Sequence, residues 1–146
     1  MPKLLCALSL AAVLFSASHA TSDPFEFREN ERVVLVGDTL IEREQTFGAL
    51  EERLSIQFPA KKITFRNLGW SADTPAGISR ASFDFDKPGR GFEILKQQIS
   101  AENPSLVIVG YGMAASFDGD AGLDRFRKEL TAFVEFVVSA GTNQPV

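Results

Sequence analysis

Apolar residues along this chain form short continuous runs that alternate with stretches of helical spacing. Residues 33–36 and 106–109 are continuous apolar runs that each end at a glycine, which is typical of strands buried on both faces of a sheet. Residues 63–65 predict a third, shorter strand between them. All three strands should therefore lie inside the fold.

Apolar residues at helical spacing predict three amphipathic helices, which cover residues 47–58, 92–99 and 123–137. The last, rich in Phe, is expected to belong to the core. Residues 71–91 and 111–121 lack periodicity and are predicted loops, the first with room for one helical turn. This alternation of strand and helix predicts an α/β fold, a parallel sheet with helices on both faces. A flavodoxin-like sheet has about five strands, so three strands indicate the front part of such a domain, incomplete at the C-terminus.

The first twenty residues have the pattern of an export signal. Lys3 is the positive start, residues 4–15 are the apolar stretch, and the small residues Ser18 and Ala20 predict cleavage after Ala20. The apolar stretch is shorter than the about 20 residues that span a membrane. We therefore expect an exported protein without a membrane anchor: a flexible lead-in over residues 21–30, one domain over residues 31–140 and a polar tail over residues 141–146.

Composition narrows the chemistry further. The chain has one Cys, Cys6, and one His, His19, and both lie in the predicted signal. This excludes an internal disulfide, a Cys-rich metal site and a multi-His zinc site, so we expect neither metal nor cofactor. The net charge of -4 argues against nucleic-acid binding, which needs a basic face.

Candidate chemistry gathers where the three predicted strands end, because ligands bind at the carboxyl ends of strands in open parallel sheets. The segments there are Gly37-Asp38-Thr39, Asn67-Leu68-Gly69-Trp70 and Gly110-Tyr111-Gly112-Met113-Ala114. In order and placement they resemble the Gly-Asp-Ser, Asn-x-Gly and Gly-x-Asn-Asp blocks of the SGNH, or GDSL-like, esterases and lipases. The resemblance runs from about residue 31 to residue 138 and implies a three-layer α/β hydrolase fold.

The resemblance also implies roles for single residues. Thr39 stands at the position of the nucleophilic serine, next to Asp38. The backbone of Gly69 would hold the oxyanion, and Ala114 replaces the oxyanion asparagine. Asn67, Trp70 and Gly112 would contact an ester or glycan ligand. The family's Asp-x-x-His block is missing and no His follows His19, so we expect little or no esterase activity.

Structural alternatives stand beside these roles. Asp38 and Thr39 are ordinary helix caps, and Gly37 and Gly69 are compatible with tight turns at positive φ. Trp70 is either a sugar-stacking platform or a residue that closes the sheet edge. Three loop carboxylates are expected to be solvated rather than to bind an ion: Asp73, Asp84 and Asp86.

The alternatives for function are a non-catalytic glycan- or partner-binding module and a gene fragment without a function. A partner chain could supply the missing C-terminal part of the sheet.

Overall fold

The computed structural model describes residues 25–84 and 86–140 and contains a parallel sheet of three strands with the order β2-β1-β3. It confirms the predicted α/β class, and its arrangement is consistent with a flavodoxin-like fold. In chain order the elements are β1 (Glu31–Gly37), α1 (Thr39–Phe47), α2 (Ala49–Gln57), β2 (Ile63–Asn67), η1 (Ile78–Ala81), α3 (Arg90–Glu102), β3 (Leu106–Gly110), α4 (Met113–Ser116), η2 (Gly119–Gly122) and α5 (Leu123–Ser139).

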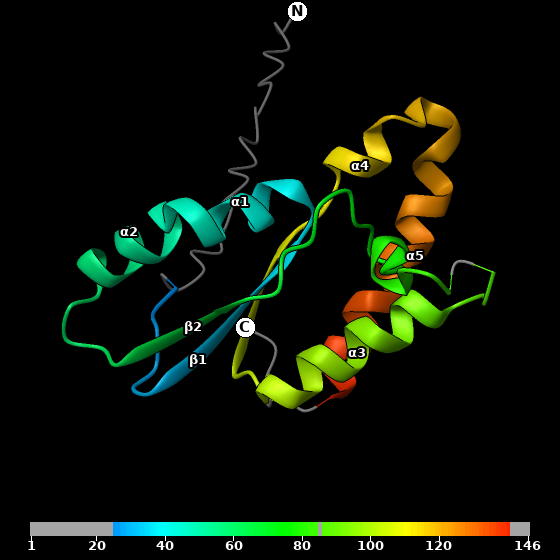
Figure 1. Ribbon diagram of the computed structural model, residues 1–146. Helices are drawn as coiled ribbons and strands as arrows, with labels where there is room; N and C mark the ends of the chain where they lie inside the picture. Colours follow the sequence, from blue (N-terminus) through cyan, green and yellow to red (C-terminus); the bar gives the residue numbers. More distant parts are fainter. Residues whose placement is uncertain (1–24, 85, 141–146) are drawn as a thin grey trace, which may run out of the picture.

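Helices cover both faces of the sheet, with α1 and α2 on one side and α3 and α5 on the other (Figure 1). Alternate residues of β1 point to opposite faces. Val33 and Leu35 therefore pack with Ile41 of α1 and with α2, while Val34 and Val36 pack with α3 and α5. β1 is the central strand and carries the core on both of its sides.

The helix predicted over residues 47–58 is corrected to two helices, the first of which begins earlier, at Thr39. Gly48 separates them with a left-handed backbone (φ 62°), a conformation that glycine adopts without a steric cost. The side chain of Asp38 accepts a hydrogen bond from Leu40 N at the start of α1. Asp38 is therefore the N-cap of α1, which confirms the capping role predicted as one alternative from the sequence.

Three further expectations are corrected. β3 is an edge strand, and its Val109 is 41% exposed rather than buried. In α5, predicted as core, Phe133 is buried whereas Val134 and Val138 are exposed, because the helix covers the sheet with one face. Phe27, placed in the flexible lead-in, is buried and its ring packs edge-on against that of Phe58. In addition, the predicted loop 111–121 contains α4 and the start of η2.

The predicted export signal and the predicted tail lie outside the described residues. Within residues 25–84 and 86–140, no helix is both long enough and apolar enough to cross a bilayer.

Candidate functional site

The three predicted strand-end segments meet at one edge of the sheet, because all strands are parallel. Trp70 N donates to Gly37 O over 3.1 Å, and Asp38 N donates to Gly110 O over 3.2 Å. The ends of β2 and β3 are thus both hydrogen-bonded to the end of β1. The structure brings together the residues that the sequence had selected.

Asp38 is the hub of this edge, with only 1% of its surface exposed. Its Oδ2 accepts hydrogen bonds from the backbone N–H groups of Gly112, Met113 and Ala114, at 3.1, 2.8 and 3.4 Å. Its Oδ1 accepts from Leu40 N at 3.3 Å. Four backbone donors thus satisfy the carboxylate, which connects the end of β1 to the segment after β3.

Thr39 is half-buried at the first position of α1, and its Oγ1 accepts a hydrogen bond from Ala72 N at 3.0 Å. A threonine nucleophile needs a neighbouring base to take its proton. The described part of the chain contains no histidine, since the single one is His19. In this structure Thr39 joins the long loop after β2 to the start of α1.

The N–H of Gly69, assigned to an oxyanion by the resemblance, donates instead to Asn67 Oδ1 at 2.8 Å. Asn67 Nδ2 in turn donates to Ile41 O at 2.7 Å, and Gln45 Nε2 donates to Gly69 O at 3.0 Å. Asn67, predicted from the resemblance to contact a ligand, therefore joins β2 to α1. An oxyanion at Gly69 would have to displace its bond to Asn67.

Gly69 is also not a positive-φ turn residue, and neither is Gly37. A Cβ at Gly69 would lie 2.3 Å from Glu42 N, and one at Gly37 would lie 2.4 Å from Gly110 O. Both glycines allow backbones to approach closely. The tight-turn interpretation of these two residues is therefore wrong, although their structural role is real.

Gly112 and Ala114 contribute their backbone N–H groups to Asp38 and not to an open cavity. Gly112 has a φ of 143°, which lets the chain turn from β3 into α4. Ala114 has no side-chain donor. The backbone groups at the expected oxyanion position are thus occupied by the protein's own carboxylate.

Trp70 is 43% exposed at this edge, and the guanidinium of Arg80 lies 5.7 Å from the centre of its ring. Such a distance is typical of a cation–π contact. Arg80 is itself buried. Trp70 therefore presents a partly exposed indole with a buried cation beside it.

Sequence reasoning missed the network beneath Trp70. Asp73, expected to be solvated, is 1% exposed and its Oδ2 lies 2.7 Å from Arg80 Nε. Arg80 also donates to Gln98 Oε1 and to Leu68 O, both at 2.6 Å. Tyr111 OH donates to Asp73 Oδ2 at 3.3 Å. The sequence signal that could have indicated this network is the pair of Asp73 and Arg80, seven positions apart in a loop otherwise rich in small residues.

Burial shifts the acid–base properties of this network. Desolvation raises the pKa of Asp73, and the adjacent guanidinium of Arg80 opposes that rise. Burial, reinforced by the charge of Asp73, raises the pKa of Tyr111 well above its usual value. Asp84, by contrast, is a loop acid whose pKa is lowered by its hydrogen bond from Lys87.

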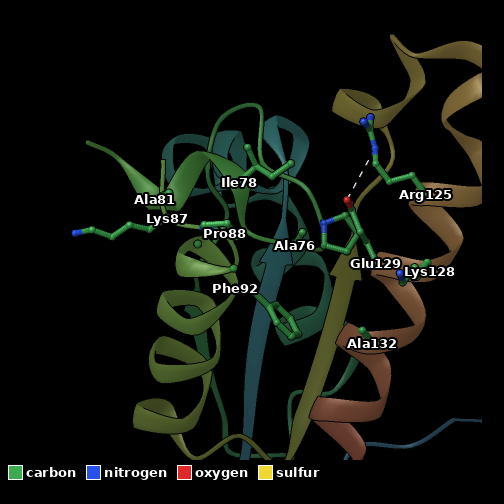
Figure 2. A pocket seen from close by; sticks show the side chains of 13 residues that line it. Ala76, Ile78, Ala81, Lys87, Pro88, Phe92, Arg125, Lys128, Glu129 and Ala132 are labelled. Carbon is green, nitrogen blue, oxygen red and sulfur yellow. Dashed lines mark ion pairs between the residues drawn. The ribbon is translucent and has the colours of Figure 1, made fainter. Parts of the chain in front are cut away.

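A groove of about 610 Å³ lies between the start of α3 and α5, apart from the predicted site (Figure 2). Its lining is mostly apolar, with Ile78 and Phe92 on one wall and Ala132 on the other. Arg125 Nε lies 3.9 Å from Glu129 Oε1 at its rim, and burial raises the pKa of Glu129. No residue of the predicted site lines this groove.

The described residues contain no group of three or more metal-ligating side chains that could hold an ion.

No protein-family model matches the sequence, and no curated protein matches it. A solved structure of a gut microbial diltiazem-metabolizing enzyme is similar to this fold with a TM-score of 0.48 and 18% sequence identity. The match covers 82% of this chain and 26% of that one, so the chain spans about a quarter of that enzyme's length. A likeness of this size carries no inference about activity.

Proposed function

We propose that this chain carries an SGNH-type ester hydrolase module, whose sheet edge binds an ester ligand such as an acylated glycan without efficient hydrolysis. The observation that carries the proposal is the assembly of the segments after β1, β2 and β3 around Asp38 at one edge. This is the edge at which open parallel sheets bind ligands.

The proposed lack of efficient hydrolysis follows from groups that are missing or already engaged. Thr39 has no histidine base within the described residues, and the N–H groups of Gly69 and Ala114 are bonded to Asn67 and Asp38. Loss of one oxyanion donor lowers kcat by about 10²–10³. The same edge keeps Trp70 partly exposed, so an aromatic surface for a ligand is present where the groups for hydrolysis are not.

An assay of the purified full chain with p-nitrophenyl acetate tests the catalytic part. We expect no turnover above the buffer rate, and the same result for Thr39→Ala. Turnover by the wild type that is lost in Thr39→Ala would show that Thr39 acts as a nucleophile and would overturn the proposal.

Sedimentation with insoluble acetylated xylan and with the same xylan after deacetylation tests the binding part. We expect retention on the acetylated polymer, and weaker retention of Trp70→Ala. A wild-type chain that binds neither polymer would overturn the ligand class.

We propose further that the protein is exported and that an apolar segment of a partner chain covers the open side of β3. Val109 on this edge strand and Val134 and Val138 on α5 support an uncovered apolar surface. A cooperative thermal transition of the isolated monomer would count against both the covering partner segment and the alternative of a gene fragment without a function.

A further inference from the structure

Arg80 is fixed in place by three different parts of the fold. Its Nε lies 2.7 Å from Asp73 Oδ2 in the long loop, its Nη1 donates to Gln98 of α3, and its Nη2 donates to Leu68 O beyond β2. All three nitrogen atoms of the guanidinium are therefore engaged. Because this group is planar, the three contacts also fix the direction of its plane.

A buried ion pair contributes little net free energy to the stability of a fold. The side chain of Arg80 is 1% exposed and that of Asp73 is 0% exposed. Apolar residues of similar volume would often stabilise a fold at least as well, because charges lose hydration on burial. A role in fixing the position of a neighbouring side chain would explain why the network is present.

The indole of Trp70 is the feature whose geometry the network defines. Arg80 lies against its ring, and the segment that carries it is anchored to the sheet edge by Trp70 N to Gly37 O and by Ala72 N to Thr39 Oγ1. Arg80 is buried while Trp70 is 43% exposed, so the exposed part of the indole points away from the guanidinium.

We propose that the Asp73–Arg80 pair is a positioning device that holds Trp70 as a rigid stacking surface for a neutral sugar ring at this edge of the sheet. The inference rests on the glycan-binding function proposed above. A rigid indole loses little freedom when a ligand stacks on it. A cationic ligand would gain little from the ring, because Arg80 already makes a cation–π contact with it.

The chain has a single Trp, so its fluorescence reports on Trp70 alone. Time-resolved anisotropy and acrylamide quenching of the full chain test the positioning without a ligand. In Arg80→Met we expect fast local motion of the indole and a quenching constant that rises about twofold. Arg80→Lys, which keeps the charge but not the planar fork, should fall between wild type and Arg80→Met. Lys87→Met, which removes an exposed ion pair of the same loop, should equal the wild type.

Gln98→Leu gives a second test if Arg80→Met does not fold, because it frees Nη1 and leaves the ion pair with Asp73 intact. The same change in anisotropy is expected, at smaller amplitude. An indole that stays as rigid as in the wild type, in folded Arg80→Met or in Gln98→Leu, overturns the positioning role.

Titration with acetylated xylohexaose by calorimetry separates this inference from the proposed function. Arg80→Met should weaken binding about fivefold, the effect of one poorly placed aromatic contact, and Trp70→Ala should abolish it. If the wild type does not bind the sugar, the glycan ligand is wrong, while the anisotropy still decides whether Arg80 positions Trp70. If Trp70→Ala abolishes binding and Arg80→Met leaves it unchanged, the positioning role is wrong and the proposed function stands.

Discussion

Two carboxylates are buried at the same edge of the sheet, one held by backbone donors alone and the other paired with a buried cation. Asp38 is surrounded by backbone N–H groups of α1 and of residues 112–114, and within the described residues it makes no ion pair. Asp73 accepts one bond from the backbone N–H of Ser79, and it also accepts from side chains, the guanidinium of Arg80 and the phenol of Tyr111. Asp38 connects the end of β1 to residues 112–114, whereas Asp73 connects the loop after β2 to Arg80 and Tyr111.

The two acids should therefore respond differently to mutations of the residues around them. The donors to Asp38 are backbone groups, so they persist as long as the strand ends stay paired. Asp73 loses its cation when the single side chain of Arg80 is replaced, and an unpaired charge then stays in a buried site. Replacements around Asp73 should therefore cost more stability than replacements around Asp38.

Arg80→Ala should have the largest effect, a loss of about 3–5 kcal/mol in the free energy of unfolding, because it leaves Asp73 buried without its cation. Denaturant unfolding followed by circular dichroism measures it. The double variant Asp73→Ala/Arg80→Ala should lose less than the sum of the two single variants. Additive losses would mean that the two side chains do not depend on each other.

Asp38→Ala should lose less, about 2–3 kcal/mol, because four backbone donors lose their acceptor but no charge is left unpaired. Asp38→Asn keeps one acceptor oxygen and should lie between Asp38→Ala and the wild type in the same unfolding experiment. A loss from Asp38→Ala larger than that from Arg80→Ala would reverse the proposed contrast between the two acids.

The contrast also explains which parts of the site could be predicted from the sequence. Asp38 follows a buried strand directly and precedes a helix, so its place and its capping role follow from local pattern. The meeting of the three strand ends follows from parallel strands. The Asp73–Arg80 pair lies in a loop without periodicity, and nothing local indicates that α3 and the end of β2 close over it.

The wrong predictions about the fold also concern properties that local sequence does not determine. The break at Gly48 depends on a left-handed backbone that leaves the apolar spacing across it intact. The exposure of Val109 depends on strand order, which places β3 at the edge. Both properties arise from the assembled chain and not from the identity of neighbouring residues.

Gly69→Ala tests the packing on the Asp38 side and should cost about 1–3 kcal/mol, since the added methyl group meets the backbone at Glu42 N. Thermal unfolding measures the loss. Gly48→Asn is the control, because the space around Gly48 is open and Asn tolerates a left-handed backbone. Equal stability of Gly69→Ala and wild type would mean that β2 and α1 can separate at no cost.

Tyr111→Phe should have the smallest effect at neutral pH, about 0.5–1.5 kcal/mol, because Asp73 loses one hydrogen bond and keeps its cation.

The pH dependence of the wild type gives the sharper result. Burial raises the pKa of Tyr111 in the folded chain, whereas an unfolded tyrosine ionises near pH 10. The stabilisation by the neutral phenol is therefore complete below about pH 10 and is lost as the pH rises further toward the folded-state pKa.

The chain has a single Tyr, so phenolate absorbance reports on Tyr111 alone. The wild type should lose stability above pH 10 more steeply than Tyr111→Phe. Ionisation of the folded chain at the ordinary tyrosine pKa would show that the Asp73 network is open to water, and the contrast with Asp38 would then disappear.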